Sequence, residues 1–154
     1  MKNLNNWLRD YSVSHKNPTN KKIHNICVPL IMYSILGMMW AIPVPSLFDV
    51  SPFLNWASLF IACCMVFYFM LGMVTGVFML IVGAIMLYAC FIVDNFENIS
   101  IFYSSLVIFI LAWVGQFIGH KIEGKKPSFF EDLQFLLVGP LWVFYPMYKG
   151  LIRK

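Results

Sequence analysis

Three histidines, His15, His24 and His120, are the residues of this 154-residue chain whose type and spacing could do chemistry. His15 and His24 flank an Asn-Pro-Thr-Asn turn at residues 17–20, which can fold one helix back so that the two rings approach. Three converging imidazoles suit a borderline divalent metal and leave coordination positions open for oxygen or substrate. Histidines at a membrane edge also form ordinary hydrogen bonds with backbone or lipid headgroups. The pattern therefore predicts either a catalytic metal site or interfacial side chains.

The polar residues near these histidines fall into three groups by the role that their chemistry allows. Amides and carboxylates can orient an imidazole ligand, carboxylates can also bind metal or transfer protons, and lysines can pair with a carboxylate headgroup. The predicted orienting side chains are Asn17, Asn20, Gln116 and Asp132, the predicted catalytic carboxylates are Glu123 and Glu131, and the predicted headgroup lysines are Lys125 and Lys126.

The composition indicates that a membrane must position these groups. The chain is 60% hydrophobic and 12% charged, and its mean hydropathy is +0.76. Soluble domains are about half apolar and about a quarter charged, so a water-soluble globule is excluded. An aromatic content of 18% excludes disorder as well. The net charge of +4, without a basic run, gives no sign of nucleic-acid binding, and the four cysteines lack metal or redox spacing.

Long uncharged stretches indicate an all-α, polytopic membrane protein with one domain over residues 1–154. A membrane-spanning helix needs about 20 apolar residues. A glycine-flanked turn at residues 72–76 divides the longest stretch into two such helices. The four predicted spans are residues 23–42, 53–71, 76–93 and 101–119.

Two further segments do not fit as simple spans. In residues 1–16, Leu4, Trp7, Leu8 and Tyr11 follow helical spacing, which predicts an amphipathic helix on the membrane surface. Residues 133–148 are apolar, but a Gly-Pro pair at 139–140 interrupts them. We interpret this segment as a re-entrant or interfacial hairpin with a cytoplasmic C-terminus, and the alternative is a fifth span.

The charges around the spans predict their orientation. Lysines precede the first span and follow the fourth, whereas the loops after the first and third spans carry acidic residues. By the positive-inside rule the N-terminus and all three histidines lie on the cytoplasmic face. The predicted location is a bacterial inner membrane, or the endoplasmic reticulum if the protein is eukaryotic.

Two groups of residues together resemble a known family. The first group is Tyr11, His15, Asn17, Asn20, His24 and Pro29, and the second is Trp113, Gln116, Phe117, Gly119, His120, Glu123, Pro127, Gly139 and Pro140. The pattern is similar to that of the iron(II)-dependent 2-hydroxy-fatty-acid dioxygenases of fungal α-oxidation, once catalogued as a domain of unknown function. The resemblance covers essentially the whole chain.

The resemblance implies an oxidoreductase that removes one carbon from a long-chain 2-hydroxy fatty acid. The implied cofactor is Fe²⁺, the co-substrate is O₂, and the histidines that match His15, His24 and His120 are the presumed iron ligands. The implied partners are membrane lipid and the fatty-acid substrate. The competing hypothesis is a non-catalytic lipid- or metal-binding membrane protein. A haem-binding electron carrier is disfavoured, because no pair of histidines brackets a mid-membrane haem.

Overall fold

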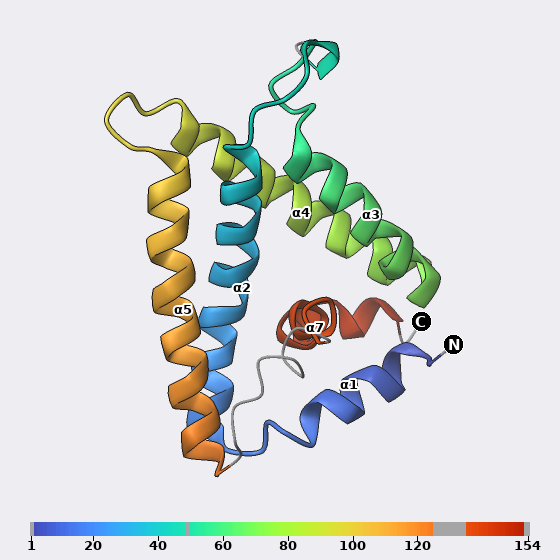
Figure 1. Cartoon of the computed structure of the whole chain (residues 1–154). Coiled ribbons are helices and arrows are strands. Elements are labelled where there is room, and N and C mark those ends of the chain that lie inside the picture. The colour runs from blue at the N-terminus through green and yellow to red at the C-terminus, as the bar shows by residue number, and fades with distance from the viewer. Residues whose placement is uncertain (1, 49, 125–134, 153–154) are drawn as a thin grey trace. The chain divides into compact units, whose positions relative to one another are not determined.

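The computed structural model describes residues 2–48, 50–124 and 135–152, and in these residues it contains helices and loops but no strand. The elements are α1 (Leu4–Ser12), α2 (Pro18–Trp40), a 3-10 turn η1 (Ser46–Phe48), α3 (Trp56–Leu71), α4 (Met73–Asp94), α5 (Ile101–Glu123) and α7 (Val138–Ile152) (Figure 1). For the described residues, the predicted all-α class is confirmed.

Three of the helices are long and apolar enough to cross a membrane. They are α2, α4 and α5, with 23, 22 and 23 residues. Helix α3 has 16 residues, and at 1.5 Å per residue it reaches about 24 Å, less than the ~30 Å hydrocarbon core. The fourth span therefore stays a prediction.

The described chain forms two compact units. We call residues 1–30 and 111–154 the terminal unit and residues 31–110 the central unit, and α2 and α5 contribute to both. All 11 Lys and Arg residues of the sequence belong to the terminal unit, and the central unit carries only Asp49, Asp94 and Glu97 as charged residues. The orientation of the chain in a membrane stays a prediction.

In the central unit, α3 and α4 pack side by side (Figure 1). The predicted turn at residues 72–76 is confined to Gly72, whose φ of 143° suits glycine because that residue has no Cβ. Helix α4 begins at the next residue. Helix α3 begins with a capping box, in which the Asn55 side chain accepts from the Ser58 N–H and the Ser58 hydroxyl accepts from the Asn55 N–H.

In the terminal unit, α1 packs against α7 (Figure 1). The apolar stripe of Leu4, Leu8 and Tyr11 is buried in the protein, and the Trp142 indole donates a hydrogen bond to the Ser12 hydroxyl at 2.8 Å. The spacing of these residues therefore correctly predicted an amphipathic helix. Within the protein, α7 packs against α1.

Helix α7 corrects one expectation about residues 133–148. Residues 135–137 form a turn, and the Gly139-Pro140 pair lies in the first turn of the helix that follows from Val138 to Ile152. The pair therefore begins a helix and does not interrupt one. Proline is tolerated in a first turn because the N–H that it lacks has no partner within the helix there. The re-entrant hairpin stays a prediction, and residues 133–134 lie outside the described part of the chain.

Candidate metal centre

The three histidines of the sequence converge in the terminal unit. His15, His24 and His120 are 2%, 1% and 5% exposed, and each offers one ring nitrogen such that these atoms lie within 4.8 Å of one another. The ring centroids are 4.3 Å apart for His15 and His24, 5.1 Å for His24 and His120, and 5.6 Å for His15 and His120. Residues distant in sequence therefore form one buried imidazole cluster.

Each histidine is placed by a different element. His15 ends the turn after α1, where its N–H donates to the Ser12 carbonyl at 3.2 Å. His24 lies in the second turn of α2, and His120 lies in the last turn of α5. Helix α2 starts at Pro18 because Asn17 caps it, accepting from the Thr19 N–H at 2.8 Å. The short turn between α1 and α2 is what places the first two rings together.

Backbone carbonyls fix the protonation of two of the rings. His15 Nδ1 lies 2.8 Å from the Tyr11 carbonyl oxygen, and His24 Nδ1 lies 3.1 Å from the Asn20 carbonyl oxygen. A carbonyl can only accept, so Nδ1 carries the proton and the lone pair of the neutral ring is at Nε2. Metal-bound histidines commonly show this arrangement, in which the nitrogen that does not bind the metal donates to a carbonyl. The donor set therefore fits a metal.

Aromatic side chains hold the His15 ring in place. The Tyr11 ring stacks on it with centroids 4.1 Å apart and planes 7° apart, and the Trp142 ring is 5.4 Å away. Tyr11 was expected both in the apolar stripe and in the family pattern beside His15, whereas Trp142 was not expected at the site. Trp142 reaches the cluster through the packing of α7 on α1, which no local pattern reveals.

Glu123 links the end of α5 to the segment between the first two histidines. One oxygen, Oε1, accepts from the Lys16 N–H at 2.7 Å. The other, Oε2, accepts from the Asn17 N–H at 2.9 Å and from Asn20 Nδ2 at 3.0 Å. Among the described residues, the groups close enough to share a metal are the three histidines alone. This geometry gives Glu123 a positioning role, and its predicted catalytic role stays a prediction.

The predicted orienting amides occupy different places. Asn17 caps α2, and Asn20, which is fully buried, orients His24 through its backbone carbonyl rather than its side chain. Gln116 is buried on α5 one turn before His120, and its orienting role stays a prediction. The remaining predicted site residues, Lys125, Lys126, Glu131 and Asp132, lie outside the described residues.

Helices α2 and α5 approach closely at Gly119. A Cβ atom there would lie 2.4 Å from Asn20 Oδ1 and 3.3 Å from His24 Cε1. We expect Gly119→Ala to push the helices apart and to lower the free energy of unfolding by about 1–3 kcal/mol, the usual cost of overpacking. Thermal unfolding in detergent measures the change. Gly150→Ala is the control, since a Cβ atom at Gly150 meets nothing within 4 Å. Equal melting temperatures for the two variants would contradict the close approach.

The described residues thus define an all-helical protein with membrane-length helices and a buried three-histidine cluster. Residues 1–151 match the family described as 2-hydroxy-palmitic acid dioxygenase Mpo1-like, and the chain belongs to this Mpo1-like family. It is similar to the 2-hydroxy-palmitic acid dioxygenase MPO1 of Saccharomyces cerevisiae, with 26% identity over 144 residues that cover 92% of this chain and 78% of the yeast protein. No solved structure matches the chain significantly. The family resemblance inferred from sequence is confirmed.

Proposed function

We propose that this chain is an iron(II)-dependent dioxygenase that shortens long-chain 2-hydroxy fatty acids by one carbon. The convergence of the three buried histidines is the observation that carries the proposal. Membership of the Mpo1-like family supports it, because the yeast relative is named for a dioxygenase that acts on a 2-hydroxy fatty acid. The reaction balances as one 2-hydroxy acid and one O₂ giving the shorter acid, CO₂ and water.

His15, His24 and His120 would hold the iron. Iron bound there supplies the redox chemistry with O₂ that side chains do not provide. The chain's own residues contribute three things: the carbonyls of Tyr11 and Asn20 aim the two Nε2 lone pairs, the aromatic rings hold His15, and burial limits water at the cluster. Lys125 and Lys126 are proposed to attract the substrate carboxylate.

The substrate's own chemistry agrees with this site. A 2-hydroxy acid carries a hydroxyl and a carboxylate on adjacent carbons and is therefore a chelator, whereas the unsubstituted acid is not. Its acyl chain is apolar, and α2, α4 and α5 are long, apolar helices. We propose that the acyl chain lies among membrane-embedded helices while the polar head reaches the cytoplasmic edge of the membrane.

The test is oxygen consumption by the purified full-length protein in detergent, loaded with Fe²⁺ under anaerobic conditions. We expect O₂ uptake with 2-hydroxypalmitic acid and formation of an acid one carbon shorter, detected by mass spectrometry. Palmitic acid, which lacks the hydroxyl, should support little uptake. Stoichiometric iron without O₂ uptake would contradict the enzymatic proposal and favour the non-catalytic, metal-binding alternative.

A further inference from the structure

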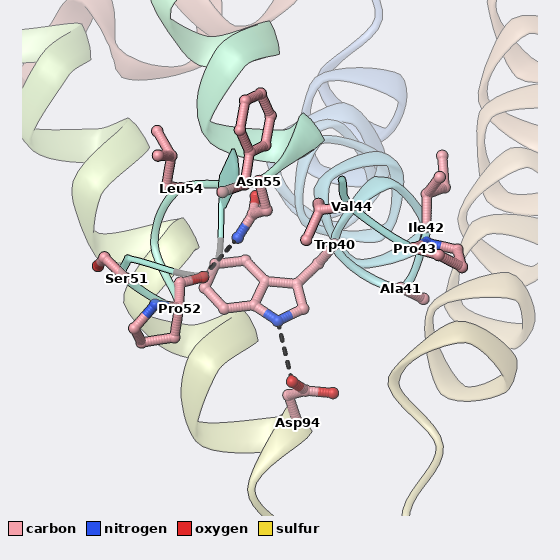
Figure 2. A pocket seen from close by; sticks show the side chains of 11 residues that line it. Trp40, Ala41, Ile42, Pro43, Val44, Ser51, Pro52, Leu54, Asn55 and Asp94 are labelled. Atoms are coloured by element: carbon pink, nitrogen blue, oxygen red, sulfur yellow. Dashed lines mark hydrogen bonds between the residues drawn. The ribbon is translucent and has the colours of Figure 1, made fainter. Parts of the chain in front are cut away.

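A cavity lies in the central unit, and none of the three histidines lines it. Its volume is about 460 Å³, and it is lined by the end of α2, the loop that follows and the end of α4 (Figure 2). Since one water takes up about 30 Å³ of liquid, the cavity has room for a small organic headgroup. The residues on which the argument rests are Trp40, Pro43, Ser51 and Asp94.

An indole and an exposed carboxylate are among the polar groups that line this cavity. Trp40 Nε1 donates to Asp94 Oδ2 at 3.0 Å, as Figure 2 shows. Trp40 is held from the side by Phe53, whose ring centroid is 5.8 Å away in an edge-to-face arrangement. An ionised carboxylate offers about four lone-pair positions, so the indole leaves Asp94 able to accept further hydrogen bonds.

The cavity favours a positive ligand. The central unit contains no Lys or Arg in its sequence, and both ion pairs within the described residues involve Asp10 of the terminal unit. No basic side chain of the central unit can therefore neutralise Asp94. Helices α2 and α4 both end at the cavity, at Trp40 and Asp94, and α3 begins there after Asn55. The two C-termini carry partial negative charge and the N-terminus carries partial positive charge, so together with the Asp94 carboxylate the negative charge dominates. An indole that lines a cavity also attracts cations through its ring.

The surroundings of the cavity favour lipid over a soluble ligand. Helices α2 and α4 are candidate membrane spans, so their ends lie where a membrane meets water. The loop beside the cavity exposes apolar side chains, among them Leu47 at 78% and Val50 at 86%. Tryptophan is enriched at membrane interfaces because one part of its side chain is apolar and another is polar.

We propose that this cavity binds the ammonium group of a phospholipid headgroup, as in phosphatidylethanolamine. The ammonium donates to the Asp94 carboxylate and lies near the Trp40 ring, and the acyl chains extend along the apolar loop. By the predicted orientation, the loop after the first span lies on the non-cytoplasmic side, so this lipid belongs to that leaflet. The inference does not depend on the proposed dioxygenase function.

The experiment uses full-length protein in maltoside micelles with 5-fluorotryptophan at its five tryptophans. The Trp40 fluorine signal is assigned with Trp40→Phe. We expect this signal to shift saturably with dihexanoyl-phosphatidylethanolamine and not with dihexanoyl-phosphatidylglycerol, which lacks an ammonium. Ethanolamine hydrochloride is the third probe. Saturation by ethanolamine at equal concentration would assign the site to a soluble amine and overturn the lipid as its source.

Two variants test whether binding depends on the negative charge of Asp94. Asp94→Asn keeps an oxygen that accepts the indole N–H but removes the charge, so we expect the midpoint concentration to rise roughly tenfold or more. Glu97→Gln removes an exposed carboxylate, three residues after Asp94, that does not line the cavity, and it should bind like the wild type. Equal shifts with both lipids, or equal midpoints for Asp94→Asn and the wild type, would overturn the proposal. The unfolding temperature of each variant shows that it is folded.

Discussion

Replacing His24 by alanine is expected to remove most of the metal that the purified protein binds. His24 is 1% exposed and its ring centroid is 4.3 Å and 5.1 Å from those of the other two histidines, so its loss takes one donor from a set of three. Loss of an outer hydrogen-bonding group already weakens metal binding by about 10–100-fold, and loss of a direct ligand should exceed that. His15→Ala and His120→Ala should behave in the same way. Metal content by mass spectrometry after dialysis is the measurement.

The matched control for this experiment is Asn25→Ala, at the neighbouring position on α2, where the side chain is exposed. This variant should keep the metal content of the wild type. Metal that binds only the folded state also stabilises it, by about 2.7 kcal/mol when its concentration is 100 times the dissociation constant. Added metal should therefore raise the melting temperature of the wild type and of Asn25→Ala but not of the histidine variants. Full metal content in all three histidine variants would show that the cluster is not the metal site.

Replacing Glu123 by alanine is expected to weaken both the fold of the terminal unit and its metal affinity. The variant loses three hydrogen bonds, from the N–H groups of Lys16 and Asn17 and from Asn20 Nδ2. Hydrogen bonds to a charged group contribute about 1.5–3 kcal/mol each, and partial exposure of Glu123 reduces this, so we expect the free energy of unfolding to fall by about 2–4 kcal/mol. Denaturant unfolding in detergent measures it. Metal affinity should fall about 10–100-fold.

The same variants distinguish a positioning role of Glu123 from a catalytic one. Glu123→Gln keeps one oxygen that can accept hydrogen bonds, so its stability should lie between those of the wild type and Glu123→Ala. If Glu123 only positions the histidines, O₂ consumption per bound iron stays close to the wild-type rate in Glu123→Gln. If Glu123 transfers protons, the rate per bound iron falls while the iron content is kept. Glu97→Ala serves as the control for loss of an exposed carboxylate.

The membrane-length helices were predictable because they coincide with long uncharged stretches. Helices α2, α4 and α5 overlap the predicted spans at 23–42, 76–93 and 101–119, and they extend beyond them at one or both ends. Hydropathy marks the apolar part of a helix, whereas caps and glycines set where the helix begins and ends. Asn17 therefore starts α2 before its apolar stretch, and Gly72 lets α4 start earlier than the predicted turn allowed.

Contacts between distant segments were not predictable from local patterns. The spacing of Leu4, Leu8 and Tyr11 indicates which face of α1 is buried but not that α7 covers it. The Gly139-Pro140 pair was expected to interrupt a helix, but it begins one, because proline suits the first turn of a helix. Sequence periodicity describes one helix at a time, and the partner of each face depends on the whole chain.

The candidate site, too, was predictable from the sequence only in part. Charge placement predicted that the three histidines share one side of the membrane, and an expected turn at residues 17–20 predicted that two of them meet. The chain instead turns at residues 13–17, because residues 18–20 already form the start of α2. The positions that bring in His120 are Glu123 and Gly119, which contact the turn and α2 across about a hundred residues of sequence. Such contacts leave no periodic signal, so the distances within the cluster come from the structure alone.

The carbonyls that hold His15 and His24 belong to the main chain of Tyr11 and Asn20, each four residues before its histidine. Every amino acid supplies such an oxygen, so mutation at those two positions cannot delete the acceptor. Substitutions at these two positions therefore keep the acceptors that orient the histidine rings, whereas substitution of a carboxylate side chain would remove its acceptor. An alanine scan would overlook these two acceptors, because the atoms that matter survive every substitution.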